Sequence, residues 1–335
     1  MSVIAAVPVL ATLIVGLSSL ASGQSLPPGG SFVDDDFNTH EGFIEAIAAQ
    51  DFTAGCDLIR YCPTRPVSRA QVASFLARAL DLPEATRDWF GDDAGSIHED
   101  NINRIADAGI TLGRADGTFD PDGGVRRDQM ASFPARALAL PPAADDYFGD
   151  DAGNTHEAAI NAVAEAGITL GCDSTGTLYC PLVEVRRDQM ASFLGRGLGL
   201  VEVSLPPPVV VPVLSMAVGD TIRVQVGGES EALRLIGIDS PEPPACLADE
   251  ATARMSELVA RRDVRIDTDT SDRDRFDRLL RYVFVDGQFV NEELVRDGLA
   301  EAVRFPPDTR LAEILEAAQE DAQADRVGVI TECCG

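Results

Sequence analysis

The stretch Arg234–Pro243, which reads RLIGIDSPEP, decides how the second half of this chain folds. It begins with an arginine, continues through large apolar residues, and ends in two carboxylates that flank a proline. Apolar runs of this kind are typical of a buried β-strand. Charged groups in such a strand are costly unless they lie together and are paired. The stretch therefore predicts a strand that brings Arg234, Asp239 and Glu242 to one polar site.

Strand geometry sets a condition on that site. Side chains alternate between the two faces of a strand, so Arg234 and Asp239 would point to opposite faces. We expect a bulge at Gly237 to restore a single face, because glycine tolerates the irregular backbone of a bulge. Pro241 cannot donate a hydrogen bond to a sheet and ends the pairing, which leaves Glu242 free to turn inward.

The residues around this stretch alternate between strand and helix patterns. Strands are expected at 221–226, 231–238, 263–269, 281–285 and 288–290. Helices are expected at 247–262, 291–298 and 308–326. Asp286-Gly287 is typical of a tight hairpin turn between two of the strands. About five short strands with three helices predict an α+β fold, an OB-fold β-barrel.

The first half of the chain repeats itself with a period of 58 residues. A Phe-x-Asp-Asp stretch recurs, and a histidine follows eight residues after each of its phenylalanines: Phe32 and His40, Phe90 and His98, Phe148 and His156. Each unit is predicted to be a helix, a Gly/Pro loop and a second helix, and is too small to bury its own apolar face. We place the repeats at 31–83, 88–141 and 146–200 and expect an all-α helical repeat bundle.

These units resemble the S-layer homology repeat, which typically occurs in threes and binds cell-wall polymer. In that family an arginine at the start of the second helix helps to hold the anionic polymer, and the matching residues are Arg69, Arg127 and Arg187. The family's glutamate two residues later is replaced by glutamine at Gln71, Gln129 and Gln189. The resemblance implies a cell-wall polymer as partner. The residues themselves leave open that these arginines only cap or solvate their helices.

Paired cysteines accompany the repeats. Four of them bracket the loops of repeats 1 and 3: Cys56, Cys62, Cys172 and Cys180. In an exported chain such spacings favour disulfides over a zinc site, which needs four close ligands. Repeat 2 has Arg114 and Asp120 at the same two places, and we expect an ion pair there. Cys246 is expected to pair with Cys333 or Cys334, because adjacent cysteines bridge each other poorly.

Composition narrows the possible functions. The formal net charge of the 335 residues is -28, and all 27 basic residues are arginines. This acidity argues against binding of nucleic acid through a broad basic surface. All three histidines lie in the repeats and are expected to be structural. The second half therefore lacks the residues for histidine-based or lysine-based hydrolysis.

Two segments are predicted to lie outside the folded units. Residues 1–23 form an apolar run that ends in small residues, which is typical of a secretory signal; a retained membrane anchor is the alternative. Residues 201–214 are rich in proline and β-branched residues and are interpreted as a linker that leads into a strand.

Four motifs stand in order in the second half: Gly219–Thr221, Arg234–Glu242, Asp274–Arg278 and Val290–Ala300. In this order and spacing they resemble the staphylococcal-nuclease-like, or thermonuclease, family over residues 215–330. The resemblance implies an OB-fold barrel with three helices. It also implies hydrolysis of phosphodiester bonds of DNA or RNA with Ca²⁺, which leaves 3′-phosphate ends.

The resemblance also implies roles for single residues. The catalytic and phosphate-binding residues of the family correspond to Arg234, Glu242 and Arg278, with Glu242 as the general base. The calcium ligands correspond to Asp220, Asp239 and the backbone carbonyl of Ser240. The residue types suit these roles, because Ca²⁺ prefers oxygen ligands and a guanidinium makes bidentate hydrogen bonds to phosphate.

The chain departs from the family at two places. Phe276-Asp277 stands where the family usually has Tyr-Gly, and Arg304 and Pro306 stand where it has a pair of tyrosines. The second change removes stacking surface for bases. Two functions remain open: a secreted, surface-attached calcium-dependent nuclease, and a non-catalytic cell-wall adhesin whose barrel binds polyanions.

Overall fold

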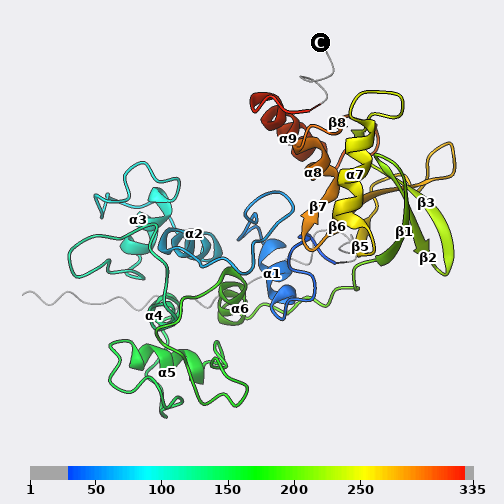
Figure 1. The fold of residues 1–335 in the computed structure, drawn as a ribbon. Helices are drawn as coiled ribbons and strands as arrows, with labels where there is room; N and C mark the ends of the chain where they lie inside the picture. The colour runs from blue at the N-terminus through cyan, green and yellow to red at the C-terminus, as the bar shows by residue number, and fades with distance from the viewer. Residues whose placement is uncertain (1–28, 329–335) are drawn as a thin grey trace, which may run out of the picture.

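The computed structural model describes residues 29–328, which form a helical unit followed by a β-barrel (Figure 1). The predicted signal at 1–23 lies outside the described residues. The helical unit contains α1 (Glu41–Ala48), α2 (Arg69–Ala79), α3 (Glu99–Asp107), α4 (Arg127–Ala137), α5 (Glu157–Glu165) and α6 (Arg187–Gly197). The predicted helical character of this part is confirmed. Within residues 29–328, none of the helices has the length and apolar character that crossing a membrane requires.

The second helix of each repeat starts with a side-chain cap. The Ser68 hydroxyl accepts a hydrogen bond from the Gln71 backbone N–H at 3.2 Å, and the Gln71 side chain accepts one from the Ser68 N–H at 3.2 Å. Gln129 and Gln189 accept the corresponding backbone N–H at the starts of α4 and α6, both at 3.2 Å. The glutamines at this position therefore satisfy backbone donors that a helix start leaves unpaired.

The repeats bury their apolar faces against one another. Helix α2 packs on α3, α4 packs on α5, and α6 returns to α1. Backbone hydrogen bonds follow the same cycle, from Val67 to Val185 at 2.9 Å, from Val125 to Val67 at 3.2 Å, and from Val185 to Val125 at 2.8 Å. One apolar core draws on all three repeats. No repeat is complete without its neighbours, as expected for units of this size.

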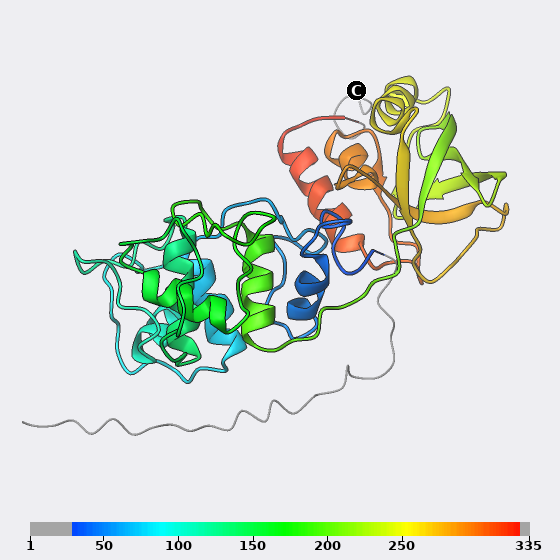
Figure 2. The same cartoon turned by 90° about the horizontal axis from the view of Figure 1, so that it is seen from below.

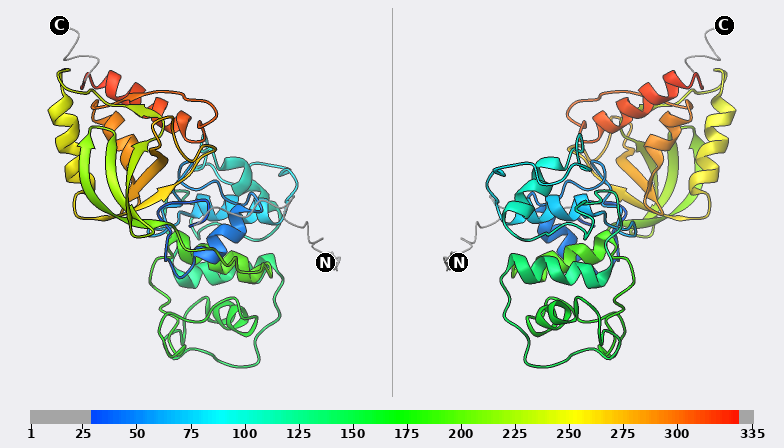
Figure 3. Two further views of the ribbon diagram at one scale, coloured as in Figure 1. Left: turned by 90° about the vertical axis from the view of Figure 1, so that its right-hand side faces the viewer. Right: turned by 90° about the vertical axis from the view of Figure 1, so that its left-hand side faces the viewer.

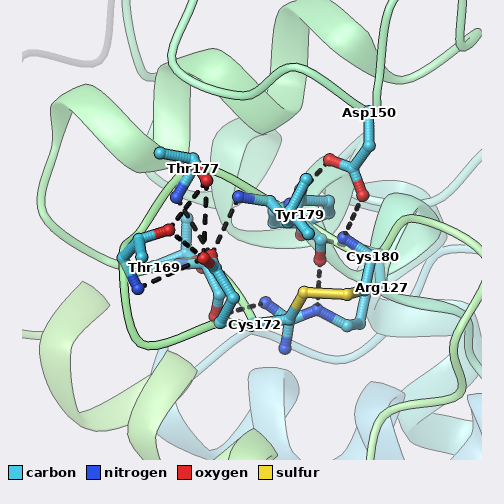
Figure 4. The surroundings of a disulfide bond; sticks show 11 residues. Arg127, Asp150, Thr169, Cys172, Thr177, Tyr179 and Cys180 are labelled. Atoms are coloured by element: carbon cyan, nitrogen blue, oxygen red, sulfur yellow. Dashed lines mark hydrogen bonds between the residues drawn. A yellow bond between two sulfur atoms is a disulfide. The ribbon is translucent and has the colours of Figure 1, made fainter.

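The three repeat arginines are part of this packing. Arg69, Arg127 and Arg187 are only 6%, 4% and 4% exposed. Their Nε atoms donate to backbone carbonyls of the neighbouring repeat, namely those of Phe119 at 2.6 Å, Tyr179 at 2.7 Å and Tyr61 at 2.8 Å. Figure 4 shows Arg127 below the Tyr179 loop. Burial lowers the pKa of each guanidinium. The alternative that these side chains only solvate their helices is therefore wrong, because they are buried.

Covalent and ionic bridges close the repeat loops. The disulfides Cys56–Cys62 and Cys172–Cys180 are present as predicted, the second shown in Figure 4. Arg114 and Asp120 form an ion pair at the equivalent place in repeat 2. Cys246 is also disulfide-bonded. Its expected partners, Cys333 and Cys334, lie outside the described residues.

The repeated histidines and aspartates have structural positions. The imidazole Nδ1 atoms contact serine hydroxyls of α6, α2 and α4: His40–Ser192 at 2.7 Å, His98–Ser74 at 2.8 Å and His156–Ser132 at 2.8 Å. Three equivalent aspartates, Asp35, Asp93 and Asp151, are buried, and their carboxylate oxygens have no hydrogen-bond partner among the described residues. Burial raises the pKa of all three, that of Asp35 to about 9. Asp35 is therefore protonated and neutral at pH 7, which lowers the cost of its burial.

The second unit is a closed barrel with three helices, as predicted. Its strands are β1 (Val210–Val218), β2 (Thr221–Val226), β3 (Glu229–Leu235), β4 (Ile238–Asp239), β5 (Asp263–Asp267), β6 (Leu279–Val285), β7 (Gln288–Phe289) and β8 (Glu301–Ala302). Its helices are α7 (Ala248–Val259), α8 (Val290–Arg296) and α9 (Ala312–Ala324). The sheet order is β3-β2-β1-β5-β6-β7, and parallel pairing of β3 with β6 closes the barrel. Figure 3 shows α7 and α9 on the outside of the strands.

The predicted linker is too long at its C-terminal end. Strand β1 begins at Val210, and Val210 and Val211 pair with Arg265 and Val264 of β5. The β-branched residues at the end of the Pro-rich segment therefore belong to the barrel. The linker brings the barrel next to the first repeat: Figures 1 and 2 place α1 beside the barrel and α3, α4 and α5 at the far end of the helical unit.

Candidate active site

Arg234 lies at the centre of the predicted site, between two carboxylates. In the β2–β3 hairpin Thr221 pairs with Arg234, so the residue before β2, Asp220, lies next to the end of β3. Arg234 Nη1 is 2.8 Å from Asp220 Oδ2, and Nη2 is 2.9 Å from Asp239 Oδ1. One guanidinium thus bridges both predicted metal ligands. Burial lowers the pKa of Arg234, and the charges of Asp220 and Asp239 counteract this effect.

The Asp220 side chain makes two further contacts. Its carboxylate accepts hydrogen bonds from the Ser240 backbone N–H at 3.0 Å and from the Thr221 hydroxyl at 3.1 Å. The side chain is buried, and burial raises its pKa, while the Arg234 charge lowers it. A Cβ atom at Gly219 would lie 2.5 Å from Ser240 Cβ, so the close approach of these two segments requires glycine.

The bulge expected at Gly237 is instead a turn. Strand β3 ends at Leu235, residues Ile236 and Gly237 form a turn with φ of 79° at Gly237, and the chain resumes as β4. Strand β4 pairs with β8, outside the barrel sheet. The chain therefore changes direction, rather than register, between Arg234 and Asp239. This change brings the two side chains together despite strand alternation.

Glu242 is brought close to this cluster but does not turn inward as expected. It is exposed in the loop that follows β4 and Pro241. Its negative charge acts on Arg234 together with those of Asp220 and Asp239. The Asp239 side chain is likewise 67% exposed, against 5% for Asp220. The site therefore has a buried carboxylate on one side of Arg234 and accessible carboxylates on the other.

Arg278 is positioned by the loop that precedes β6. Asp274 accepts hydrogen bonds from the Arg278 backbone N–H at 3.0 Å and from Arg278 Nε at 2.7 Å. Burial alone would raise the pKa of Asp274, but the hydrogen bonds from Arg278 hold it below its usual value. Arg278 Nη1 lies 3.3 Å from the hydroxyl of Thr221, which also contacts Asp220. Thr221 therefore links the two arginines of the site through Asp220.

A cavity of about 500 Å³ opens beside the two arginines. Arg234, Arg278, Asp274, Phe276 and Phe305 are among its lining residues. The two phenylalanines are 64% and 52% exposed, so their rings are accessible at the cavity. The site thus combines guanidinium groups with accessible aromatic faces, and it can accept an anion that carries a planar group.

The donor set next to Arg234 suits a hard cation. No group of three or more Asp, Glu, His or Cys side chains within residues 29–328 is arranged to hold a metal ion. Two carboxylates, Asp220 and Asp239, nevertheless share one positive partner, and the buried Ser240 hydroxyl beside them has no hydrogen-bond partner among the described residues. Oxygen donors of this kind are those that calcium prefers.

Sequence reasoning missed three residues of the site. Asp274 could have been recognised from the Asp-x-Phe-Asp pattern, because aspartate side chains commonly bond to backbone N–H groups two residues on. Its bond to the Phe276 N–H is 2.9 Å long. Thr221 carries no signal beyond its position after Asp220. Phe305 stands between Arg304 and Pro306, the two positions at which family tyrosines are absent, and it supplies an aromatic ring in their place.

Two family models match the chain. The model described as staphylococcal nuclease homologue matches residues 232–331, and the model described as S-layer homology domain matches residues 92–131. The first match contains Arg234, Asp239, Glu242 and Arg278, and the second covers much of repeat 2.

Three bacterial nucleases are each similar to about a third of the chain. Endonuclease YncB of Bacillus subtilis is 34% identical over 119 residues, which are 33% of this chain and 56% of that protein. The thermonuclease of Staphylococcus hyicus is 35% identical over 111 residues, 31% of this chain and 66% of that protein. The thermonuclease of Staphylococcus intermedius is 31% identical over 117 residues, 33% of this chain and 70% of that protein. The chain thus spans little more than half the length of the first of these relatives. Through its C-terminal barrel, and with an S-layer homology domain before it, the chain belongs to the staphylococcal nuclease family.

Proposed function

We propose that this protein is a calcium-dependent nuclease that hydrolyses phosphodiester bonds of DNA or RNA at the barrel site and is attached to the cell surface through its repeats. The observation that carries the proposal is the Arg234 guanidinium between Asp220 and Asp239, with Arg278 at the same cavity. Two arginines beside accessible carboxylates suit a substrate that is an anion. The nuclease part corresponds to residues 215–330 and the anchor to 31–200.

Each polar side chain of the site has its own role in hydrolysis. Arg234 and Arg278 stabilise the charge that develops on the phosphate oxygens, since a guanidinium donates two parallel hydrogen bonds. Asp274 holds Arg278 in place for this contact. Glu242, exposed and near Arg234, accepts the proton of the attacking water. Asp220, Asp239 and the Ser240 carbonyl would hold Ca²⁺, which supplies positive charge to the phosphate when bound.

Product ends distinguish cleavage from binding. Single-stranded DNA treated with the protein in calcium buffer is expected to yield fragments with 3′-phosphate ends, which a polymerase extends only after phosphatase treatment. The polyanion-binding adhesin would retain the DNA uncut. Fragments that are extended without phosphatase treatment would contradict the proposed direction of bond cleavage.

Phe276 and Phe305 are proposed to stack on bases of the substrate. Stacking on an aromatic side chain contributes roughly 1–3 kcal/mol per base. Phe305→Ala is therefore expected to weaken binding of single-stranded DNA by about 5- to 100-fold, with a smaller change in kcat. Paired bases are already stacked, so duplex DNA should lose less. Fluorescence anisotropy and initial rates measure the two effects.

Phe37→Ala is the matched control, because Phe37 is 74% exposed and lies in repeat 1, away from the cavity. Phe37→Ala should leave both the binding of single-stranded DNA and kcat unchanged. Equal loss of binding in the two variants would contradict a specific role for Phe305.

Two cavities support the proposed anchoring. They have volumes of about 480 and 390 Å³, and they are lined by Arg127 and Arg187 respectively. Arg187 Nη2 has no hydrogen-bond partner among the described residues. Full-length protein is expected to sediment with purified cell wall and to stay in solution with wall stripped of its anionic polymers. Equal sedimentation with both would argue against anchoring through these sites. Export, as expected from residues 1–23, is part of the same proposal.

A further inference from the structure

The first repeat contacts the barrel through a buried arginine. Arg265 of β5 is 6% exposed, and its Nη1 donates to both carboxylate oxygens of Asp36 at 2.8 Å and to the Phe32 carbonyl at 3.1 Å. Its Nε and Nη2 bond to Asp267 at 2.9 and 3.1 Å. The guanidinium is therefore neutralised by one carboxylate from each unit. Loss of Asp36 would remove two hydrogen-bond acceptors from the buried Nη1 of Arg265, and this loss is costly for a buried charged donor.

A second ion pair and an apolar contact accompany this arginine. Arg60 of repeat 1 lies 2.6 Å from Glu292 of α8, whose side chain is 6% exposed. Val33 and Ile59 of repeat 1 are 6% and 3% exposed and pack with the apolar core of the barrel. Phe32, adjacent to Val33, packs with the helical core instead. The boundary between the two cores thus runs through the first repeat.

Repeat 1 differs from repeats 2 and 3 at the residues that face the barrel. The positions of Val33, Asp36 and Arg60 carry Gly91, Ala94 and Thr118 in repeat 2, and Gly149, Ala152 and Leu178 in repeat 3. Ile59, two residues before Tyr61, corresponds to Gly117 and Thr177. The residues that build each repeat stay the same, such as the phenylalanine that opens the Phe-x-Asp-Asp stretch and the histidine after it. The differences add apolar and charged side chains where repeats 2 and 3 have small or uncharged ones.

We infer that repeat 1 is a docking repeat, specialised to hold the nuclease barrel against the helical unit as one rigid body. Repeat 2 and the first helix of repeat 3, α5, lie at the end of the helical unit away from the barrel (Figure 1). The linker then does not act as a flexible tether, because the interface rather than the linker fixes the relative position of the units. The active site consequently has one orientation relative to whatever the repeats bind.

Cutting the linker tests this inference independently of enzymatic activity. A site for a sequence-specific protease inserted after Ser204, an exposed linker residue, allows the full chain to be purified and then cleaved. The two halves of the otherwise unchanged protein are expected to co-elute in size-exclusion chromatography at low micromolar concentration. Separation of these halves into two species would overturn the inference.

A repeat-matched variant identifies the surface responsible. It carries Val33→Gly, Asp36→Ala, Ile59→Thr and Arg60→Thr, which are residues that sister repeats hold at these positions. Removal of two partly buried ion pairs and two apolar side chains is expected to raise the dissociation constant between the halves by about 100-fold or more. Circular dichroism of the cleaved variant checks that both halves remain folded. If they do not, the single substitution Asp36→Ala replaces this variant, and it too is expected to raise the dissociation constant between the halves.

The control places the same charged side chains on repeat 2. Ala94→Asp with Thr118→Arg adds an acid and a base at a site away from the barrel and should leave co-elution unchanged. A folded repeat-matched variant whose halves associate as tightly as those of the parent would contradict the docking role of repeat 1.

Discussion

Glu242→Gln is expected to lower the turnover of single-stranded DNA by about 10²- to 10⁴-fold, the usual contribution of a general base. The amide has the size and hydrogen-bonding capacity of the acid, but it cannot accept the proton of the attacking water. Because Glu242 is exposed, the substitution leaves no buried group unpaired, and the fold should be unaffected. Loss of one negative charge near Arg234 should leave DNA binding equal or slightly tighter. Steady-state kinetics and a binding titration in calcium buffer separate the two effects.

Glu250→Gln is the matched control for this experiment. Glu250 is an exposed carboxylate in the first turn of α7, so the same chemical change is made outside the cluster around Arg234. Its turnover should equal that of the parent protein. A Glu242→Gln protein as fast as the parent would remove Glu242 from the mechanism.

Arg234→Lys is expected to lower kcat/KM by about 10²-fold or more, comparable to removal of one group that stabilises a developing oxyanion. The planar guanidinium reaches Asp220 and Asp239 with different nitrogen atoms. An ammonium group is a point charge and cannot reproduce this bridge or a bidentate contact to phosphate. Since Asp220 is buried, a weaker partner should also lower the thermal midpoint. Initial rates and thermal unfolding give the two measurements.

Arg275→Lys provides the comparison. Arg275 lines the same cavity, but it is exposed, and its guanidinium carbon lies 4.7 Å from the centre of the Phe276 ring. The substitution keeps the charge at the cavity and removes no bridge between carboxylates, so activity should stay within a few-fold of the parent. Equal loss in both variants would mean that general positive charge, rather than the Arg234 geometry, supports the reaction.

The hydrophobic pattern of the sequence predicted those helices and strands that depend mainly on residues close to each other in the chain. The alternation of 221–226 matches β2 at both ends, and the amphipathic stretch at 247–262 contains α7. Strand β1 was not among the expected strands, because its partner, β5, lies about 50 residues further along the chain and the proline-rich composition before it resembles a linker. The burial of Arg127 is a similar case. Its partner is a carbonyl of the next repeat, and no local pattern distinguishes such an arginine from a solvated one.

The sequence predicted which residues form the site, but it did not predict how they are arranged in space. The stretch from Arg234 to Glu242 indicated which charges belong together, and resemblance to a family supplied Asp220 and Arg278. The turn at Gly237, which replaces the expected bulge, depends on pairing of β4 with β8 from a distant part of the sequence. Phe305 could not be assigned, because exposure of an aromatic residue at a cavity is a property of the folded chain.

The most direct measurement is the cleavage rate of single-stranded DNA by the full-length protein at millimolar calcium, in excess chelator, and after calcium is restored. The account predicts rapid cleavage with calcium, loss of cleavage in chelator, and recovery when calcium is added back. Cleavage that persists in excess chelator, or DNA that is bound but never cut at any calcium concentration, would contradict it.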